Sequence, residues 1–123
     1  METNSKIDFV TALKARTKQF VLDAIGFYQK LPKTEEARII GRQFMRSSSS
    51  VGANYRAACR SRSKAEFHSK ISIVIEEADE SAFWLEILSD SKIVNAIDVA
   101  ALLKEVNEIL AIVARARKTV SSK

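Results

Sequence analysis

Hydrophobic residues recur at three- and four-residue spacing in four separate stretches of the chain, each long enough for several helical turns. This spacing places apolar side chains on one face of an α-helix. The stretches predict helices at approximately residues 6–31, 35–61, 64–89 and 98–119. Four such helices with short connections predict a single all-α domain over residues 1–123, an antiparallel up-down four-helix bundle. The inward residues predicted for the first helix are Phe9, Leu13, Phe20, Ala24, Phe27 and Leu31.

The breaks between these stretches contain residues typical of helix boundaries. Pro32 disfavours helical backbone at the preceding residue, and Thr34 can cap the helix that follows. Ser63 begins an S-x-x-E capping box in front of the third helix. The polar residues 89–92 predict the last turn, and Asp98 is the predicted N-cap of the fourth helix.

Residues 46–58, RSSSSVGANYRAA, have the composition of a linker but keep the helical spacing. Apolar or small residues continue at gaps of three or four from Ala37 to Ala58, so the serines are predicted to lie inside the second helix. We expect Ser47 and Ser48 to let a neighbouring backbone approach, with each hydroxyl bonding the carbonyl one turn back. The residues predicted for close packing, within the bundle or between subunits, are Ser47, Ser48, Val51, Asn54 and Tyr55.

Composition agrees with a helical protein and narrows its class. Among 123 residues there are 3 glycines and 1 proline, which leaves few tight turns. No apolar run approaches the roughly 18 residues of a membrane span, and the N-terminus lacks a signal-peptide pattern. We therefore expect a cytoplasmic protein without a membrane partner. A single cysteine, Cys59, excludes an internal disulfide.

The net charge of +5 is distributed unevenly along the chain. Residues 32–62 contain seven Lys/Arg and two Asp/Glu, whereas residues 63–90 contain two and seven. The two segments can pair with each other inside one bundle, or the basic segment can face an anionic partner. The total charge does not distinguish these alternatives.

Five arginines of the predicted second helix lie on one side of it. At about 100° per residue they fall within a sector of roughly 80°, and they extend over about 33 Å. Guanidinium groups suit phosphate because they donate two parallel hydrogen bonds. The candidate nucleic-acid-binding residues are Arg38, Arg42, Arg46, Arg56 and Arg60. The alternative is a face that is solvated, or paired with acids of the third helix or of a neighbouring subunit.

Candidate catalytic and metal-binding groups are few. The acidic residues within 76–80 lack the inward Glu-x-x-His pairs of a di-metal bundle, and the one histidine, His68, lies outside such a pattern. Nothing in the sequence places Cys59 beside His68 as nucleophile and base, and there is no phosphate-binding glycine loop. We therefore expect no catalytic residues, no metal and no cofactor.

A long pattern joins the second and third predicted helices over residues 46–88. It consists of an R-S-[SA]-x-S-[VI]-x-x-N motif and spaced positions after it, namely Arg46, Ser47, Ser48, Ser50, Val51, Asn54, Lys64, Phe67, Glu77, Ser81 and Leu85. In this pattern the chain resembles the bacterial four-helix bundle protein family, also described as the proteins encoded in intervening sequences of large-subunit ribosomal RNA genes. Ala57 departs from it, since the family usually has glutamate there.

The resemblance implies an up-down four-helix bundle that assembles into a ring-like homo-oligomer, often a pentamer. Related accessory proteins of diversity-generating retroelements use a basic surface to engage nucleic acid and a reverse transcriptase. The implied partners are therefore other copies of the chain, RNA or DNA, and a protein such as a reverse transcriptase. The expected function is that of a non-enzymatic oligomeric bundle that binds nucleic acid. The alternative is a purely structural protein–protein interaction module with no nucleic-acid binding.

Overall fold

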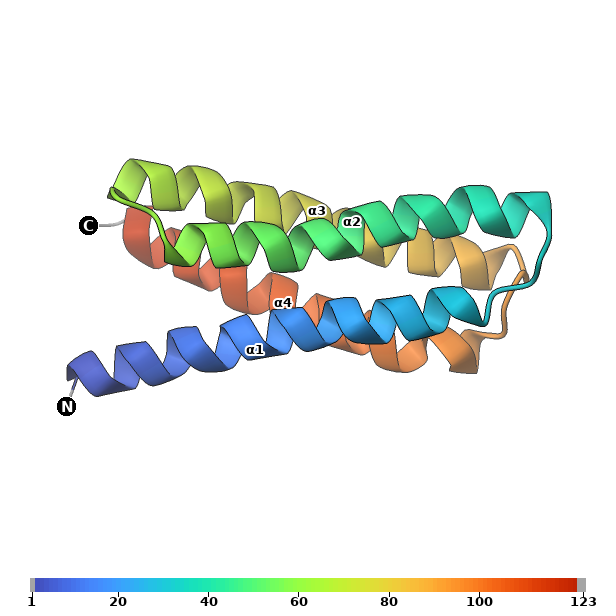
Figure 1. The fold of residues 1–123 in the computed structure, drawn as a ribbon, viewed down its shortest axis with the longest axis horizontal. Helices are drawn as coiled ribbons and strands as arrows, with labels where there is room; N and C mark the ends of the chain where they lie inside the picture. Colours follow the sequence, from blue (N-terminus) through green and yellow to red (C-terminus); the bar gives the residue numbers. More distant parts are fainter. Residues whose placement is uncertain (1, 122–123) are drawn as a thin grey trace.

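The computed structural model describes residues 2–121, which form four long helices joined by short connections (Figure 1). Successive helices run in opposite directions, so the predicted all-α, antiparallel up-down bundle is confirmed. The helices are α1 (Glu2–Gln29), α2 (Glu35–Cys59), α3 (Lys64–Asp90) and α4 (Ala96–Ser121).

Two of the three predicted caps are present. The hydroxyls of Thr34 and Ser63 each accept a hydrogen bond from the backbone N–H three residues later, at 3.3 and 3.0 Å. The predicted N-cap of α4, Asp98, was wrong, because the helix begins at Ala96 and Asp98 lies in its first turn. An acid is favoured at the cap and in the first turn alike, since both lie at the positive end of the helix dipole.

The other helix ends lie close to the predicted ones but do not coincide with them. α1 begins earlier, at Glu2, and ends earlier, at Gln29, while α2 ends at Cys59. α3 and α4 continue slightly further than expected, to Asp90 and Ser121. The last turns of a helix lack part of their hydrogen bonding, so sequence spacing does not fix the terminal residue.

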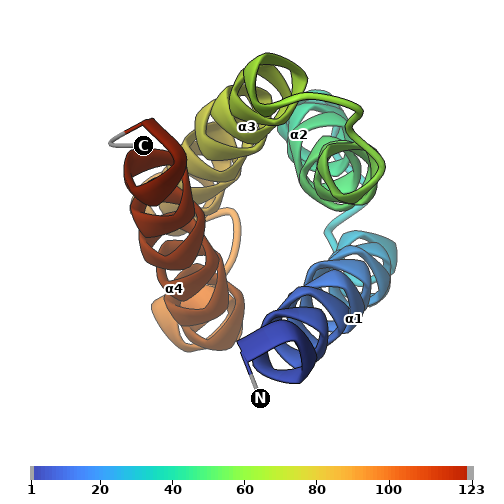
Figure 2. The same cartoon turned by 90° about the vertical axis from the view of Figure 1, so that its left-hand side faces the viewer.

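The four helices form a square in cross-section (Figure 2). α2 packs between α1 and α3, and α4 closes the square between α3 and α1. Within the described chain, α1 and α3 lie at opposite corners and do not contact each other. The outer faces of these two helices therefore point to different sides of the molecule.

Side chains from all four helices fill the core, as the spacing predicts. One residue at the edge of the core was predicted wrongly. Phe20 of α1 and Phe44 of α2 are fully buried and meet edge to face, with ring centroids 6.4 Å apart. Phe9 was predicted to face inward, but it is 51% exposed. The N-terminal part of α1 diverges from the other helices in Figure 1, so Phe9 lines a hollow shared with Tyr55 and Phe67 and is not fully buried against them.

The serine run lies inside α2, where Ser47 and Ser48 are buried. Ser47 Oγ donates to the Phe44 carbonyl at 3.1 Å, and Ser48 Oγ donates to the Met45 carbonyl at 3.3 Å. Ser81 of α3 faces this point, with its Oγ 2.9 Å from Ser47 Oγ. The stretch is therefore not a linker but a place where two helices approach across small side chains.

Glycines mark the close approach of α1 to α2. A Cβ atom on Gly52 would lie 2.8 Å from Val21 Cγ2, and one on Gly41 would lie 2.8 Å from Tyr28 Cε1. Neither distance allows a normal van der Waals contact, so a larger residue forces the helices or their side chains to move. Around Gly26, by contrast, a Cβ atom meets nothing within 4 Å.

We expect Gly26→Ala to raise the free energy of unfolding by about 1 kcal/mol, because alanine loses less backbone entropy in a helix and meets no steric conflict here. Gly52→Ala is the matched control. It gains the same helix propensity but must displace Val21, so its stabilisation is expected to be smaller. Urea unfolding followed by far-UV circular dichroism measures both. A Gly52→Ala protein as stable as Gly26→Ala would contradict the close approach.

Arg16 ties α1 to α4. Its Nε lies 2.6 Å from Glu105 Oε2 and its Nη2 lies 2.8 Å from Glu105 Oε1, which makes the pair bidentate. Nη2 is also 3.4 Å from Glu108. The hydrogen bond from Arg16 is the main cause that holds the pKa of Glu105 below its ordinary value. This pair reinforces the connection between two helices that are adjacent in space but distant in sequence.

The lowered pKa of Glu105 predicts a pH dependence of stability. A carboxylate with a lower pKa in the folded state stabilises the fold above its unfolded pKa of about 4.3, and this is lost as the pH falls through the folded value. Because the Glu105 side chain is 30% exposed, we expect Glu105→Gln to cost only about 0.5–1 kcal/mol at neutral pH. The difference from wild type should shrink at pH 3 in urea unfolding. A pH-independent difference would contradict this interpretation.

Candidate nucleic-acid interface

The five candidate arginines, four in α2 and Arg60 at its C-cap, are all exposed, but they have different neighbours. Arg38 lines a small pocket beside the connection from α1, together with Tyr28 and Pro32. No acid within the described residues lies within 4 Å of Arg38 or Arg42 to form an ion pair. The remaining three arginines turn toward different helices.

Arg46 pairs with two acids of α3. Its Nη1 lies 2.9 Å from Glu77 Oε2, and its Nη2 bonds to Glu80 Oε2. Trp84 Nε1 donates to the same oxygen of Glu80 at 3.0 Å. The Trp84 bond, and then the Arg46 bond, hold the pKa of Glu80 below its ordinary value. The charge of Arg46 is thus matched inside the bundle, as in the alternative that the sequence left open.

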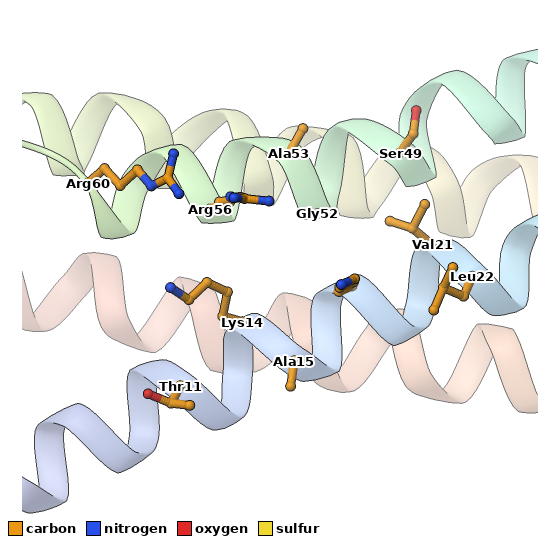
Figure 3. Close-up of a pocket in the computed structure, with 11 residues that line it drawn as sticks. Thr11, Lys14, Ala15, Val21, Leu22, Ser49, Gly52, Ala53, Arg56 and Arg60 are labelled. Atoms are coloured by element: carbon orange, nitrogen blue, oxygen red, sulfur yellow. The ribbon is translucent and has the colours of Figure 1, made fainter.

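Arg56 and Arg60 lie instead where α2 faces α1. With Lys14 and Lys18 of α1 they line a groove of about 620 Å³, which we call the basic groove (Figure 3). Figure 3 shows Lys14 on one wall, opposite the two arginines. The lining contains no acidic residue. In the described part of the chain, no acid lies within 4 Å of any of the four cations to form an ion pair.

The rest of the basic groove is small and largely apolar. Gly52 and Val21 both line it, and the two helices approach each other closely at this pair. No aromatic residue lines the groove, so bases find no stacking platform there. Such a site suits contact with phosphates and does not suit the reading of bases. Its other residues are Thr11, Ala15, Leu22, Ser49 and Ala53.

Lys14 and Lys18 were not among the residues predicted from the sequence. They lie four residues apart, which is about one helical turn, and so share a face of α1. That spacing was visible in the sequence as a lysine pair on the first helix. Periodicity alone does not predict that the Lys14 and Lys18 face of α1 lies next to the side chains of Arg56 and Arg60.

The residues predicted for close packing or an interface lie against the rest of the same copy. Asn54 is half-buried and donates its amide to the Ser50 carbonyl at 3.0 Å. Burial raises the pKa of the Tyr55 hydroxyl well above its ordinary value, and the neighbouring Cys59 raises it further. These side chains pack within the bundle, and of the five only Asn54 is partly exposed; their predicted role between subunits stays a prediction. The buried members are Ser47, Ser48, Val51 and Tyr55.

Residues 2–121 were also searched for metal-binding, catalytic and membrane-spanning features. This part of the chain has no group of three or more His, Cys, Asp and Glu side chains arranged to hold a metal ion. Cys59 is half-buried at the end of α2, and His68 is exposed on α3. None of the helices described combines the length and the apolar character that crossing a membrane requires.

Comparison with known proteins identifies a matching family and a similar solved structure. A family model described as 23S rRNA-intervening sequence protein matches residues 12–115. A crystal structure from Bacteroides thetaiotaomicron, described as a protein with unknown function from the S23 ribosomal protein family, superposes with a TM-score of 0.81. The two chains are 26% identical, and the match covers 86% of this chain and 98% of the other. No curated protein matches. Neither description names an enzyme.

Proposed function

The chain belongs to the 23S rRNA-intervening sequence protein family, and we propose that it is a cytoplasmic, non-enzymatic bundle that self-associates and binds the phosphate backbone of RNA or DNA. The observation that supports nucleic-acid binding is the basic groove, where Lys14, Lys18, Arg56 and Arg60 meet without an acid. A homo-oligomeric ring, often a pentamer, is what the resemblance to the family implies for self-association.

The arrangement of charge in the groove favours a polyanion. Like charges repel each other weakly in water and more strongly near a protein surface, so four cations that line one groove gather counterions. A nucleic-acid backbone displaces these counterions, which makes its binding favourable and dependent on salt. The two cations of each wall lie about 6 Å apart along their helix, so each wall presents a pair of charges to a strand that follows the groove.

Salt dependence tests the proposal. If each of the four cations neutralises one phosphate, the logarithm of the affinity should fall with the logarithm of the salt concentration with a slope of about −3 to −4. Fluorescence anisotropy of a short labelled RNA, and of a DNA duplex of the same sequence, measures the slope. An affinity that is flat between low and moderate salt would exclude phosphate binding in the groove.

Two single substitutions refine this experiment. Lys18→Gln is expected to make the slope shallower by about one, because it removes one phosphate contact. Arg46→Gln is the matched control, since Arg46 is paired with Glu77 and Glu80 and should contribute little to the slope. Equal changes in the two variants would mean that the binding site is the whole arginine face of α2 and not the groove.

A protein–protein interaction module without nucleic-acid binding is the second candidate function. It is supported by large apolar side chains that are exposed in the described structure, among them Leu22 of α1 at 50% and Ile97 of α4 at 81%. In that case a protein such as a reverse transcriptase, or another copy of the chain, would occupy the basic surface. Neither RNA nor DNA would then bind at any salt concentration, whereas charge reversal in the groove would disrupt the assembly.

A further inference from the structure

The outward face of α3 has a composition opposite to that of the basic groove. Its residues follow one another at gaps of three or four, so they lie along one side of the helix, and all are exposed. Four of them are acids, none of which has a basic group within 4 Å in the described chain. We call this face the acidic stripe, and its members are Glu76, Asp79, Phe83, Glu86 and Asp90.

Phe83 gives the acidic stripe an apolar centre. Its side chain is 49% exposed, with two of the acids before it and two after it. The ring is supported from the side by Trp84, with centroids 4.9 Å apart and an edge-to-face arrangement. Trp84 is itself held by its bond to Glu80. Phe83 is therefore presented in a fixed position on the surface, which lowers the entropic cost of burying it in a contact.

The spacing of charged and apolar groups on α3 matches that in the groove. On α1, Leu22 is half exposed, and Lys18 and Lys14 lie about 6 and 12 Å from it along the helix. On α3, Asp79 and Glu76 lie about 6 and 10 Å from Phe83 along the helix. An α3 helix laid along the groove can therefore place Phe83 against Leu22 while its acids reach the cations.

This contact cannot form within one copy. The groove lies between α1 and α2, whereas α3 is at the corner opposite α1 and makes no contact with it (Figure 2). We infer that the acidic stripe of a second copy of this chain docks in the basic groove. The inference rests on the self-association proposed above and assigns the two surfaces that make it.

An interface between two different faces is head-to-tail. Each copy then uses its groove toward one neighbour and its acidic stripe toward the other, and such contacts generate closed rings or open chains. The groove of an assembled copy is filled by the α3 of its neighbour. A nucleic-acid strand and a neighbouring copy therefore exclude each other from one groove, and RNA is expected to shift the assembly toward smaller species.

Charge reversal with mixing tests the docking. One variant, Lys14→Glu/Lys18→Glu, reverses the two α1 cations that a docked stripe would face and leaves the stripe unchanged; the other, Glu76→Lys/Asp79→Lys, reverses the two acids that would face them and leaves the groove unchanged. Each alone brings like charges together, so native mass spectrometry should shift from a multiple of 13.7 kDa to the single chain. In an equimolar mixture, every contact between unlike variants pairs opposite charges again, so alternating assemblies of the two variants should form; a ring with an odd number of copies cannot alternate, so even-numbered or open species are expected. Lys104→Glu, an exposed α4 position outside both surfaces, is the control and should assemble like wild type.

The outcomes separate this inference from the proposed function. If either variant alone keeps the wild-type mass, or if the mixture stays monomeric while circular dichroism shows both variants folded, the docking is wrong, although self-association stands. A wild type that is monomeric at micromolar concentration overturns both. RNA binding is read separately on Glu76→Lys/Asp79→Lys, whose groove is intact and free. A failure to bind there, with reassembly in the mixture, overturns nucleic-acid binding and leaves the docking supported.

Discussion

Replacing Phe44 with alanine is expected to lower the free energy of unfolding by about 3–5 kcal/mol, the largest effect of a single substitution proposed for this protein. The Phe44 side chain on α2 is fully buried. Its ring meets Phe20 at 6.4 Å and Phe27 at 5.6 Å between centroids, both edge to face and both from α1. The variant therefore loses apolar burial and two ring contacts, and it leaves a cavity between two helices.

Phe83→Ala is the matched control for this prediction, because it removes the same side chain from the surface of α3. With the ring 49% exposed, we expect a loss of at most about 1 kcal/mol in urea unfolding. If the docking inference is right, the same variant also weakens self-association. Equal destabilisation by the two substitutions would contradict the assignment of Phe44 to the core.

Reversing two charges of the basic groove is expected to have the largest effect on nucleic-acid binding. Arg56→Glu/Arg60→Glu removes two of the four cations of the groove and replaces them with groups that repel phosphate. A charge-assisted hydrogen bond contributes about 1.5–3 kcal/mol, so the loss of two predicts at least about a 100-fold decrease in affinity at low salt. Anisotropy titration of labelled RNA measures the decrease, and unfolding in urea verifies that the variant remains folded.

Arg38→Glu/Arg42→Glu provides the comparison. The change in net charge and the helix are the same, but these arginines lie outside the groove lining. We expect a decrease of about 10-fold or less, because the effect acts through the overall field and is screened by salt. Losses of the same size in the two double variants would favour the continuous arginine face predicted from the sequence.

Periodicity and caps were sufficient to predict the bundle, including the helix that crosses the serine run. They failed at Phe9, because the spacing of apolar residues tells which side of a helix faces inward but not how far its neighbours extend. They also failed at Asp98, since an acid fits the cap and the first turn alike. Both errors concern the ends of elements, where local signals are weakest.

The candidate site was less predictable than the fold. A helical projection places Arg46, Arg56 and Arg60 on the same face, but long side chains lean toward different neighbours. Arg46 meets acids of α3, and the other two face lysines of α1. Which helix borders each edge of α2 is a property of the packed bundle, so no pattern within α2 alone could group the cations correctly. The resemblance to the family predicted the fold but did not predict which cations lie together.

The contact between Ser47 and Ser81 has a consequence for the alignment of α2 and α3. Each hydroxyl has a carbonyl partner in its own helix, Phe44 for Ser47 and Glu77 for Ser81, whereas the 2.9 Å bond between the two hydroxyls crosses the helices and forms only in this longitudinal register. A slip by one turn would place Ser47 against Ala78 or Leu85, both fully buried and apolar. The hydrogen bond between the two serines thus favours one register of α2 against α3 among those that the hydrophobic residues tolerate. It contributes to the uniqueness of the structure more than to its stability.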